Sequence, residues 1–255
     1  MFSKPTKLHR TIRKRTEKAI YDFGMINPGD RVLIGLSGGA DSMALMQIFM
    51  GGFVQVTSDF EWVAVHVDTG MPVEQETRQD WESFVESLGI DFRLIRTKIW
   101  DSAFAPDATK RPCFICSMYR RQRIYEAADN YHCNKIAYAH HKDDIVETLL
   151  LNILYGRKIE AMHPVQEVFR GTMHIIRPFC YIEEPLIKKL TGESGLPVLP
   201  KACPMDGQSH RQKVKDIIAI LQTGEKNANI RENIFKSMSH IHLTSPYIPK
   251  PENRD

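Results

Sequence analysis

The chain has 255 residues and a net charge of +3. This length fits one α/β domain with small additions, and the mild charge excludes a protein whose whole surface is built to bind nucleic acid. No window approaches the roughly eighteen consecutive apolar residues of a transmembrane helix, and the basic N-terminus lacks the apolar core of a signal peptide. Five cysteines are an odd number in a chain too long to need disulfide bonds, so we expect a cytoplasmic protein without a membrane partner.

Residues 6–24 have the spacing of an amphipathic helix, with apolar side chains on one face and basic side chains elsewhere. A solvated helix face is the ordinary explanation of any single lysine here. Taken together, the basic residues form a candidate phosphate-contacting surface, for which we select Arg10, Arg13 and Lys14. A turn at residues 27–30 then leads into the first strand, so residues 1–28 are a basic N-terminal helical segment.

The most informative motif lies in residues 31–43. The apolar run from Arg31 to Leu36 predicts a strand buried on both faces, and a glycine turn then leads into an apolar helix. Free amides at a helix N-terminus favour an anion, and glycines let the backbone approach a phosphate closely. An ordinary capped turn is the alternative. The candidate phosphate-binding residues are Ser37, Gly38, Gly39, Ala40, Asp41 and Ser42, without the Gly-Lys-Ser/Thr ending of a Walker A loop.

The rest of the chain alternates apolar runs with helical patterns, which is typical of a parallel sheet covered by helices. The further strands are predicted over residues 62–68, 92–95, 135–139 and 175–177. Helices are predicted over residues 74–88, 144–154, 184–190, 208–222 and 226–239, whereas 100–111 has an irregular pattern. The tail at 245–255 carries three prolines and little to bury, so we expect it to be poorly ordered.

Polar side chains occur where two of the predicted strands end. His66 and Asp68 close the second strand, and His140 and Asp144 follow the fourth. Open α/β sheets bind ligands at the carboxyl ends of their strands, which favours a binding site for these four residues. A turn-forming aspartate, a helix cap and plain surface charge are the alternatives.

A pair of cysteines, Cys113 and Cys116, stands at the start of a predicted helix with two residues between them. This spacing suits one metal centre, although a redox pair or two buried thiols would have the same pattern. Cys133 and Cys180 have the surroundings of core residues, whereas Cys203 lies in a proline-bounded loop that can return to the pair. Three thiolates leave one coordination position open, which indicates a reactive site rather than a structural one.

Several motifs occur together and in order: residues 37–42, the cysteine pair, Ala139–Asp144, Ile176–Phe179 and Cys203. This combination resembles the PP-loop ATP pyrophosphatases, which split ATP between its α and β phosphates. It is most similar to their branch of tRNA 2-thiocytidine synthetases, and the likeness runs from about residue 30 to about residue 215. The resemblance implies a Rossmann-type parallel sheet of about five strands with helices on both faces. It also implies a PP-loop domain over 29–205, C-terminal helices over 206–244 and a flexible tail over 245–255.

The resemblance further implies a 4Fe-4S cluster on Cys113, Cys116 and Cys203, with an open iron that carries the sulfur. ATP and Mg²⁺ would bind at residues 37–42, with adenosine near His66 and Asp68. The tRNA cytidine would first be adenylated at its C2 oxygen, and sulfur would then replace AMP. Asp41, Asp144 and Arg120 are the implied catalytic residues; His140 completes the ATP site, and Asp144 is the candidate Mg²⁺ ligand. The implied RNA contacts, besides the N-terminal ones, are Arg121, Lys142, Arg157 and Lys158.

The implied partners are tRNA, a sulfur-donor protein such as a cysteine desulfurase, and a second copy of the chain. Two positions depart from the family pattern. Ala40 replaces the usual loop lysine, and Arg120 stands where some relatives have a lysine near the cluster. The absence of additional zinc-binding cysteines favours cytidine over uridine as the substrate. Lysidine synthetase, an amide-forming ligase, a cluster-bearing relative that thiolates uridine or removes sulfur, and a zinc-stabilised RNA-binding module stay open as alternatives.

Overall fold

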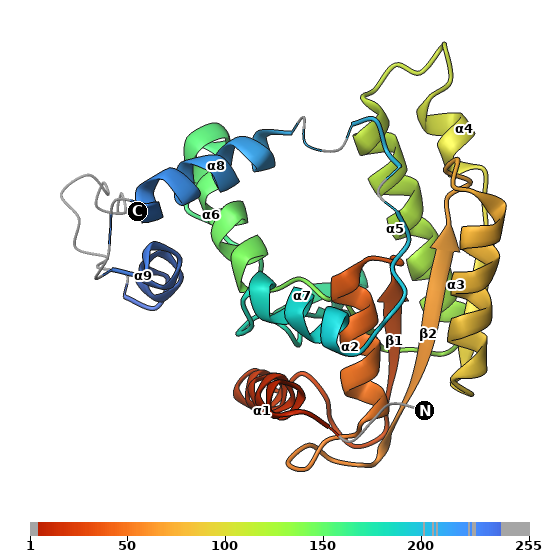
Figure 1. The fold of residues 1–255 in the computed structure, drawn as a ribbon, viewed down its shortest axis with the longest axis horizontal. Helices are drawn as coiled ribbons and strands as arrows, with labels where there is room; N and C mark the ends of the chain where they lie inside the picture. The colour runs from red at the N-terminus through yellow and green to blue at the C-terminus, as the bar shows by residue number, and fades with distance from the viewer. Residues whose placement is uncertain are drawn as a thin grey trace, which may run out of the picture.

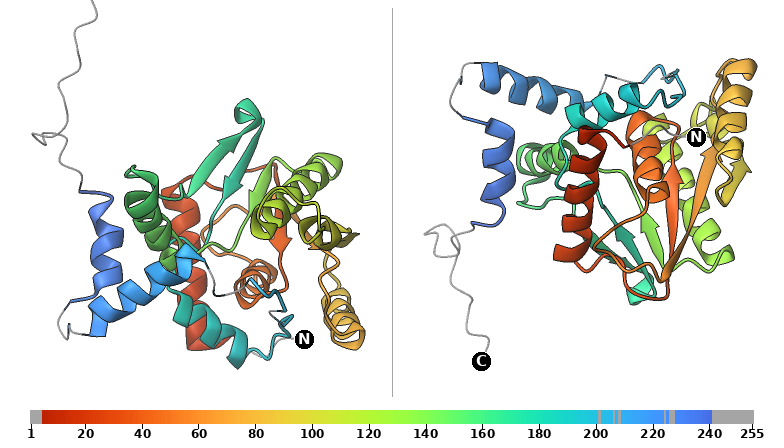
Figure 2. Two further views of the ribbon diagram at one scale, coloured as in Figure 1. Left: turned by 90° about the horizontal axis from the view of Figure 1, so that it is seen from above. Right: turned by 60° about the horizontal axis from the view of Figure 1, so that its bottom comes forward.

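The computed structural model describes residues 5–200, 202–205, 207, 209–223, 225 and 228–240. Its centre is a sheet of six strands in the order β3-β2-β1-β4-β6-β5, drawn in Figures 1 and 2. The strands are β1 (Asp30–Leu36), β2 (Phe60–Asp68), β3 (Phe92–Arg96), β4 (Lys135–Ala137), β5 (Val165–Val168) and β6 (Met173–Ile176). The five strands predicted from the sequence are all present, and they run parallel to one another.

The sixth strand corrects the expected count of five. β5 pairs antiparallel with β6 at the edge of the sheet, with Val165 opposite Ile176. Its sequence, Val-Gln-Glu-Val, has only four residues and two exposed polar side chains, so no apolar run announces it. Arg177 fixes this hairpin, because its guanidinium donates to the carbonyl of His163 and to Gln166 Oε1 (3.1 Å).

The helices follow the predicted pattern with one addition. A short helix, α4, occupies part of the segment that was expected to be irregular. The helices are α1 (Lys7–Asp22), α2 (Ala40–Met50), α3 (Gln75–Ser87), α4 (Ile99–Ala103), α5 (Pro112–Asn130), α6 (Lys142–Gly156), α7 (Glu184–Glu193), α8 (His210–Thr223) and α9 (Ile230–Ser237), with a 3-10 turn, η1, at Phe169–Gly171. Among the described residues, no helix has both the length and the apolar character needed to cross a bilayer. The predicted tail at 245–255 lies outside the described residues.

Each face of the sheet carries its own core. Val32, Ile34 and Leu36 of β1 pack with α1, α2 and α7, whereas Leu33 packs with α5 on the opposite face. This alternation follows from the two-residue period of a strand and explains the nearly continuous apolar sequence of β1. The basic helix α1 shares the first core through Ile12, so it is built into the domain.

The strand order reverses between β1 and β4. The chain runs from β1 outward to β2 and β3 and then returns to the other side of β1 for β4. The loops after β1 and β4 therefore diverge and leave a crevice at the carboxyl ends of these two strands. On the β4 side, α6 follows the strand, and α8 and α9 pack against α6 (Figure 1).

Candidate functional site

A cavity of about 320 Å³ lies at this reversal point. It is lined by the ends of β1 and β4, by the start of α2 and by one face of α5. Seven residues selected from the sequence line it together: Ser37, Asp41, Ser42, Arg120, Arg121, His140 and Asp144. The other predicted ATP contacts, Gly38, Gly39 and Ala40, belong to the loop beside the cavity. Residues far apart in the sequence meet here because β1 and β4 end, and α2 begins, at the same edge of the sheet.

The loop after β1 is held open by its own hydroxyl groups. Ser42 Oγ donates to Gly39 O (2.9 Å) and accepts from the amide of Ser37 (3.1 Å). No side chain caps α2, whose first residue is Ala40. The amides at the start of this eleven-residue helix are therefore available to an anion, and the helix dipole favours negative charge there.

Gly38 is the point at which another segment crosses the loop. Its φ is +81°, and a Cβ built on it would lie 2.5 Å from Leu199 Cδ1. Leu199 also donates its amide to Gly38 O at 2.9 Å. Only glycine combines this backbone with such a close neighbour. The segment that leads to Cys203 is therefore anchored on the phosphate loop.

Two carboxylates face the cavity from different elements. Asp41 Oδ1 is buried without a hydrogen-bond partner, and burial is the main cause that raises the pKa of Asp41. Asp144 adds to this rise through its negative charge, while His141 opposes it. Two like charges around one cavity repel each other, so the arrangement fits a cation between them or a proton on Asp41.

Asp144 is held in place from two sides. Its Oδ2 accepts from the amide of His141 (3.0 Å), which closes the N-terminal cap of α6. Its Oδ1 accepts from Arg211 Nη1 (2.9 Å), which comes from α8. The sequence did not point to Arg211, because nothing in its local pattern shows that α8 returns to the carboxyl end of β4. This arginine is the functional residue that sequence reasoning missed.

The cavity's histidine is neutral at pH 7. Burial lowers the pKa of His140 to about 4, and its Nδ1 has no hydrogen-bond partner. Its ring lies 5.5 Å from that of Tyr138, which also lines the cavity. His140 therefore offers a polar but uncharged contact to a bound molecule.

His66 and Asp68 do not line this cavity, although we selected them as adenosine contacts. Val67 lines it instead, and neighbouring residues of a strand point to opposite faces. His66 Nδ1 lies 2.8 Å from Leu36 O, and burial lowers its pKa. Asp68 accepts from Arg78 (3.1 Å) and Arg96 (3.2 Å), so its charge is neutralised within the protein.

The three cysteines selected from the sequence gather at the start of α5. Cys113 is exposed, whereas Cys116 and Cys203 are half-buried. Burial is the main cause that raises the pKa of Cys116; Arg120 opposes it, and Cys203 and Cys113 add to it. The described residues contain no set of three or more His, Cys, Asp or Glu side chains poised around a single metal ion. The donor set of three neighbouring thiols beside a cation fits the softer chemistry of an iron–sulfur centre.

Arg120 links the cysteines to the cavity. It follows Cys116 by one helical turn, its charge opposes the rise in the pKa of that thiol, and its side chain lines the cavity. Cys133 and Cys180 are 4% and 0% exposed, which confirms that they are core residues.

The predicted RNA contacts lie in different surroundings. Arg10, Lys14, Arg121 and Arg157 are exposed, Lys158 pairs with Glu160 (2.8 Å), and Arg13 lies 4.0 Å from Glu17. Lys142 differs from the expectation. Its side chain is buried and pairs with Glu183 (3.4 Å) and Glu232, so it joins α6, α7 and α9 instead of facing solvent.

Residues 8–197 match the family model of the PP-loop domain, so the fold and the loop together define a PP-loop protein. Two curated relatives are named tRNA-cytidine(32) 2-sulfurtransferase. The one from Polynucleobacter asymbioticus is 34% identical over 92% of this chain and 77% of its own length. The one from Vibrio cholerae is 35% identical over 92% of this chain and 75% of its own length. The chain belongs to the PP-loop family, in the branch of the tRNA-cytidine(32) 2-sulfurtransferases.

A solved structure supports the fold independently. The U34-tRNA thiolase NcsA from Methanococcus maripaludis, determined with its [4Fe-4S] cluster, superposes with a TM-score of 0.72 at 19% identity. The match covers 97% of this chain and 85% of that one. At this identity the likeness is one of fold, and it confirms the predicted α/β architecture.

Proposed function

We propose that the protein is an ATP-dependent tRNA sulfurtransferase that converts a cytidine to 2-thiocytidine. The observation that carries the proposal is the shared position of Arg120. Its side chain lines the cavity that also contains Asp41 and Asp144, and its positive charge opposes the rise in the pKa of the Cys116 thiol. The proposed ATP site and the proposed cluster site therefore both adjoin the same helix, α5. The names of the curated relatives support the same activity.

In the first step, the C2 oxygen of the cytidine attacks the α-phosphate of ATP, and pyrophosphate leaves. The amides at the start of α2 and the hydroxyl of Ser37 stabilise the phosphate charge, which grows on the transferring group. Arg120 supplies a permanent positive charge at the same cavity. An incoming sulfide then forms a bond to C2, and the C2–oxygen bond breaks with AMP as the leaving group.

Two absent groups fit residues of this site. Asp41 and Asp144 would hold Mg²⁺, which neutralises phosphate charge when bound. Cys113, Cys116 and Cys203 would hold a 4Fe-4S cluster, which supplies a position for the incoming sulfur when bound. The unpartnered oxygen of Asp41 and the three neighbouring thiols are the observations that support these assignments.

The test is purification without oxygen, followed by iron analysis and an absorption spectrum. We compare the wild type with Cys203→Ser and with the control Cys133→Ala, which changes a core thiol outside the group of three. The wild type and the control should contain about four irons per chain and absorb broadly in the visible, whereas Cys203→Ser should lose both. A colourless, iron-free wild type would exclude the sulfur-transfer proposal and favour a PP-loop ligase.

A further inference from the structure

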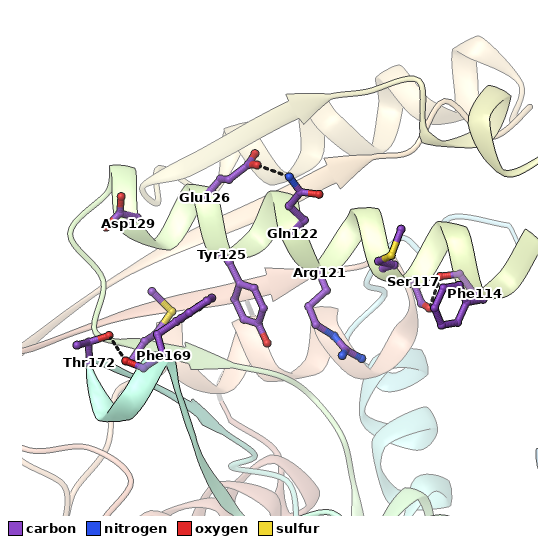
Figure 3. A pocket seen from close by; sticks show the side chains of 11 residues that line it. Phe114, Ser117, Arg121, Gln122, Tyr125, Glu126, Asp129, Phe169 and Thr172 are labelled. Atoms are coloured by element: carbon purple, nitrogen blue, oxygen red, sulfur yellow. Dashed lines mark hydrogen bonds between the residues drawn. The ribbon is translucent and has the colours of Figure 1, made fainter. Parts of the chain in front are cut away.

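A second cavity, larger than that of the candidate site, lies beside it. It has a volume of about 830 Å³ and lies between α5 and the η1 turn of the β5–β6 hairpin. Figure 3 shows Phe169 from the turn and Tyr125 from the helix bordering the same space. Ser117 and Arg121 line both this cavity and the cavity of the candidate site, which we call the nucleotide cavity. The two cavities are therefore adjacent.

Aromatic faces are presented to solvent here. Phe169 is 56% exposed and Phe114 is 50% exposed, although both are large apolar side chains. Phe169 meets Tyr125 edge-to-face, with ring centroids 5.0 Å apart and planes at 81°. Exposed rings that border one cavity offer an apolar surface on which a flat ligand can stack.

The backbone that carries Phe169 is strained. Its φ is +51°, and that of Arg170 is +59°, a region that non-glycine residues seldom occupy. Two consecutive residues in this conformation place the Phe169 ring beside Tyr125. Such strain persists where the surrounding structure requires a particular placement of side chains.

Three charged side chains line the cavity, one of them basic (Arg121) and two acidic (Glu126 and Asp129). Arg121 lines the cavity, and it has no ion-pair partner among the described residues. In Figure 3, Arg121 and Tyr125 point to the same side of α5, whereas Glu126 and Gln122 point to the other. Glu126 forms an ion pair with Arg123 (2.7 Å). Asp129 lies near the C-terminal end of α5, away from Arg121. A phosphate could therefore reach one unpaired guanidinium, that of Arg121, on the same side of α5 as the Tyr125 ring.

We infer that this cavity binds unpaired RNA bases next to the target nucleotide by stacking them on Phe169 and Tyr125. Aromatic platforms flanked by arginine are how proteins hold single-stranded nucleic acid. The shared Arg121 would contact the backbone between the stacked base and the base being modified. This inference rests on the proposed function and names the part of the substrate that the site holds.

The experiment uses an RNA hairpin in which one loop base is 2-aminopurine, whose fluorescence is quenched when it stacks. Binding to the full chain is titrated in the absence of ATP, so no turnover is needed. Phe169→Asn removes the ring and keeps a residue that tolerates positive φ, whereas Phe169→Tyr retains a ring. Tyr119→Ala is the matched control, because Tyr119 is a half-exposed aromatic of α5 that lines neither cavity.

We expect quenching with the wild type, a dissociation constant about tenfold higher for Phe169→Asn, and little change for Phe169→Tyr and Tyr119→Ala. Unchanged affinity and quenching in Phe169→Asn would overturn the stacking site while leaving the proposed function intact. Displacement of the quenched base by ATP would also overturn it, since the cavity would then belong to the nucleotide. A wild type that binds no hairpin at all would overturn both the stacking site and the RNA-modifying function.

Discussion

Asp41 is a residue at which the fold favours function over stability. Its carboxyl oxygen is buried without a partner, and burial raises its pKa. Because the folded state holds the proton more tightly than the unfolded state, the stability contributed by this group falls as the pH rises from its ordinary pKa through the raised one. A ligand cation would remove this penalty, which is why a nucleotide site can retain such a residue.

Replacing Asp41 by asparagine should therefore separate stability from activity. We expect Asp41→Asn to have a higher melting temperature than the wild type at neutral pH without nucleotide, because the buried charge is gone. Its ATP-dependent activity should fall about a hundredfold or more, because the site loses a charge that holds the metal and phosphate. Thermal unfolding and AMP release measure the two effects. A less stable protein that is fully active would contradict this role.

Gly38 gives a second prediction at the scale of one residue. Alanine at Gly38 or at Gly29 meets a similar positive φ, +81° and +78°, which costs about 1–2 kcal/mol at either position. Only at Gly38 would the new Cβ meet Leu199; Gly29 has nothing within 4 Å. Gly38→Ala should thus lower the free energy of unfolding by about 1–3 kcal/mol more than Gly29→Ala, as measured in urea. Equal losses would show that Leu199 is not anchored on the loop.

Local pattern predicted residues that the fold brings to one cavity, among them Ser37, Asp41 and Ser42, because this loop motif is short and continuous. Local pattern did not predict which side chains at the end of a strand point into the cavity. His66 and Asp68 were selected by position, yet the strand's alternation turns Val67 toward the cavity. Lys142 looked like surface charge, and only the fold shows that two glutamates surround it.

At the scale of elements, the contact between α6 and α8 combines an apolar cluster of Val146, Val214 and Ile218 with one buried carboxylate. Glu147 of α6 is 2% exposed and lies between Arg211 (3.8 Å) and Lys215 (3.6 Å) of α8. Burial still raises its pKa to about 6. The folded state therefore favours the protonated form, and the stability that this group contributes is present at low pH and is lost as the pH rises from about 4.5 to about 6.

Glu147→Gln should be increasingly stabilising across that pH range. The amide carries no charge to desolvate, so above pH 6 the variant should gain up to about 2 kcal/mol relative to the wild type. Urea unfolding of both proteins at several pH values measures this difference. A difference that does not depend on pH, or a variant that is less stable at pH 7, would contradict the raised pKa.

The elements themselves were mostly predictable, because the strands of the sheet's centre are apolar runs and the helices have clear periodicity. The exceptions have physical reasons. β5 is short, polar and at an edge, and its position depends on Arg177 and on pairing with β6. The return of α8 to the nucleotide cavity depends on the pair of Arg211 with Asp144, two residues on separate helices.

At the scale of the whole molecule, a mild net charge coexists with a basic surface on α1. If Arg10 and Lys14 contact phosphates of the RNA, the double variant Arg10→Ala/Lys14→Ala should bind tRNA more weakly at low salt. The slope of log affinity against log salt concentration should also fall by about one per lost contact. The control is Arg93→Ala, which removes a positive charge from the edge strand β3. Equal slopes for all three proteins would exclude α1 from the RNA surface.

The proposed enzyme couples ATP cleavage to sulfur transfer in one chain, and a reaction with tRNA as the substrate measures both products together. The protein prepared without oxygen is incubated with ATP, Mg²⁺, a sulfide source and tRNA that lacks thiolation, and the nucleosides are then analysed by mass spectrometry. We predict 2-thiocytidine and AMP in equal amounts from the wild type. Neither should exceed background with Asp41→Asn or with an ATP analogue that cannot be cleaved between its α and β phosphates. Formation of AMP without any thiolated cytidine, or of 2-thiocytidine without ATP, would contradict the account.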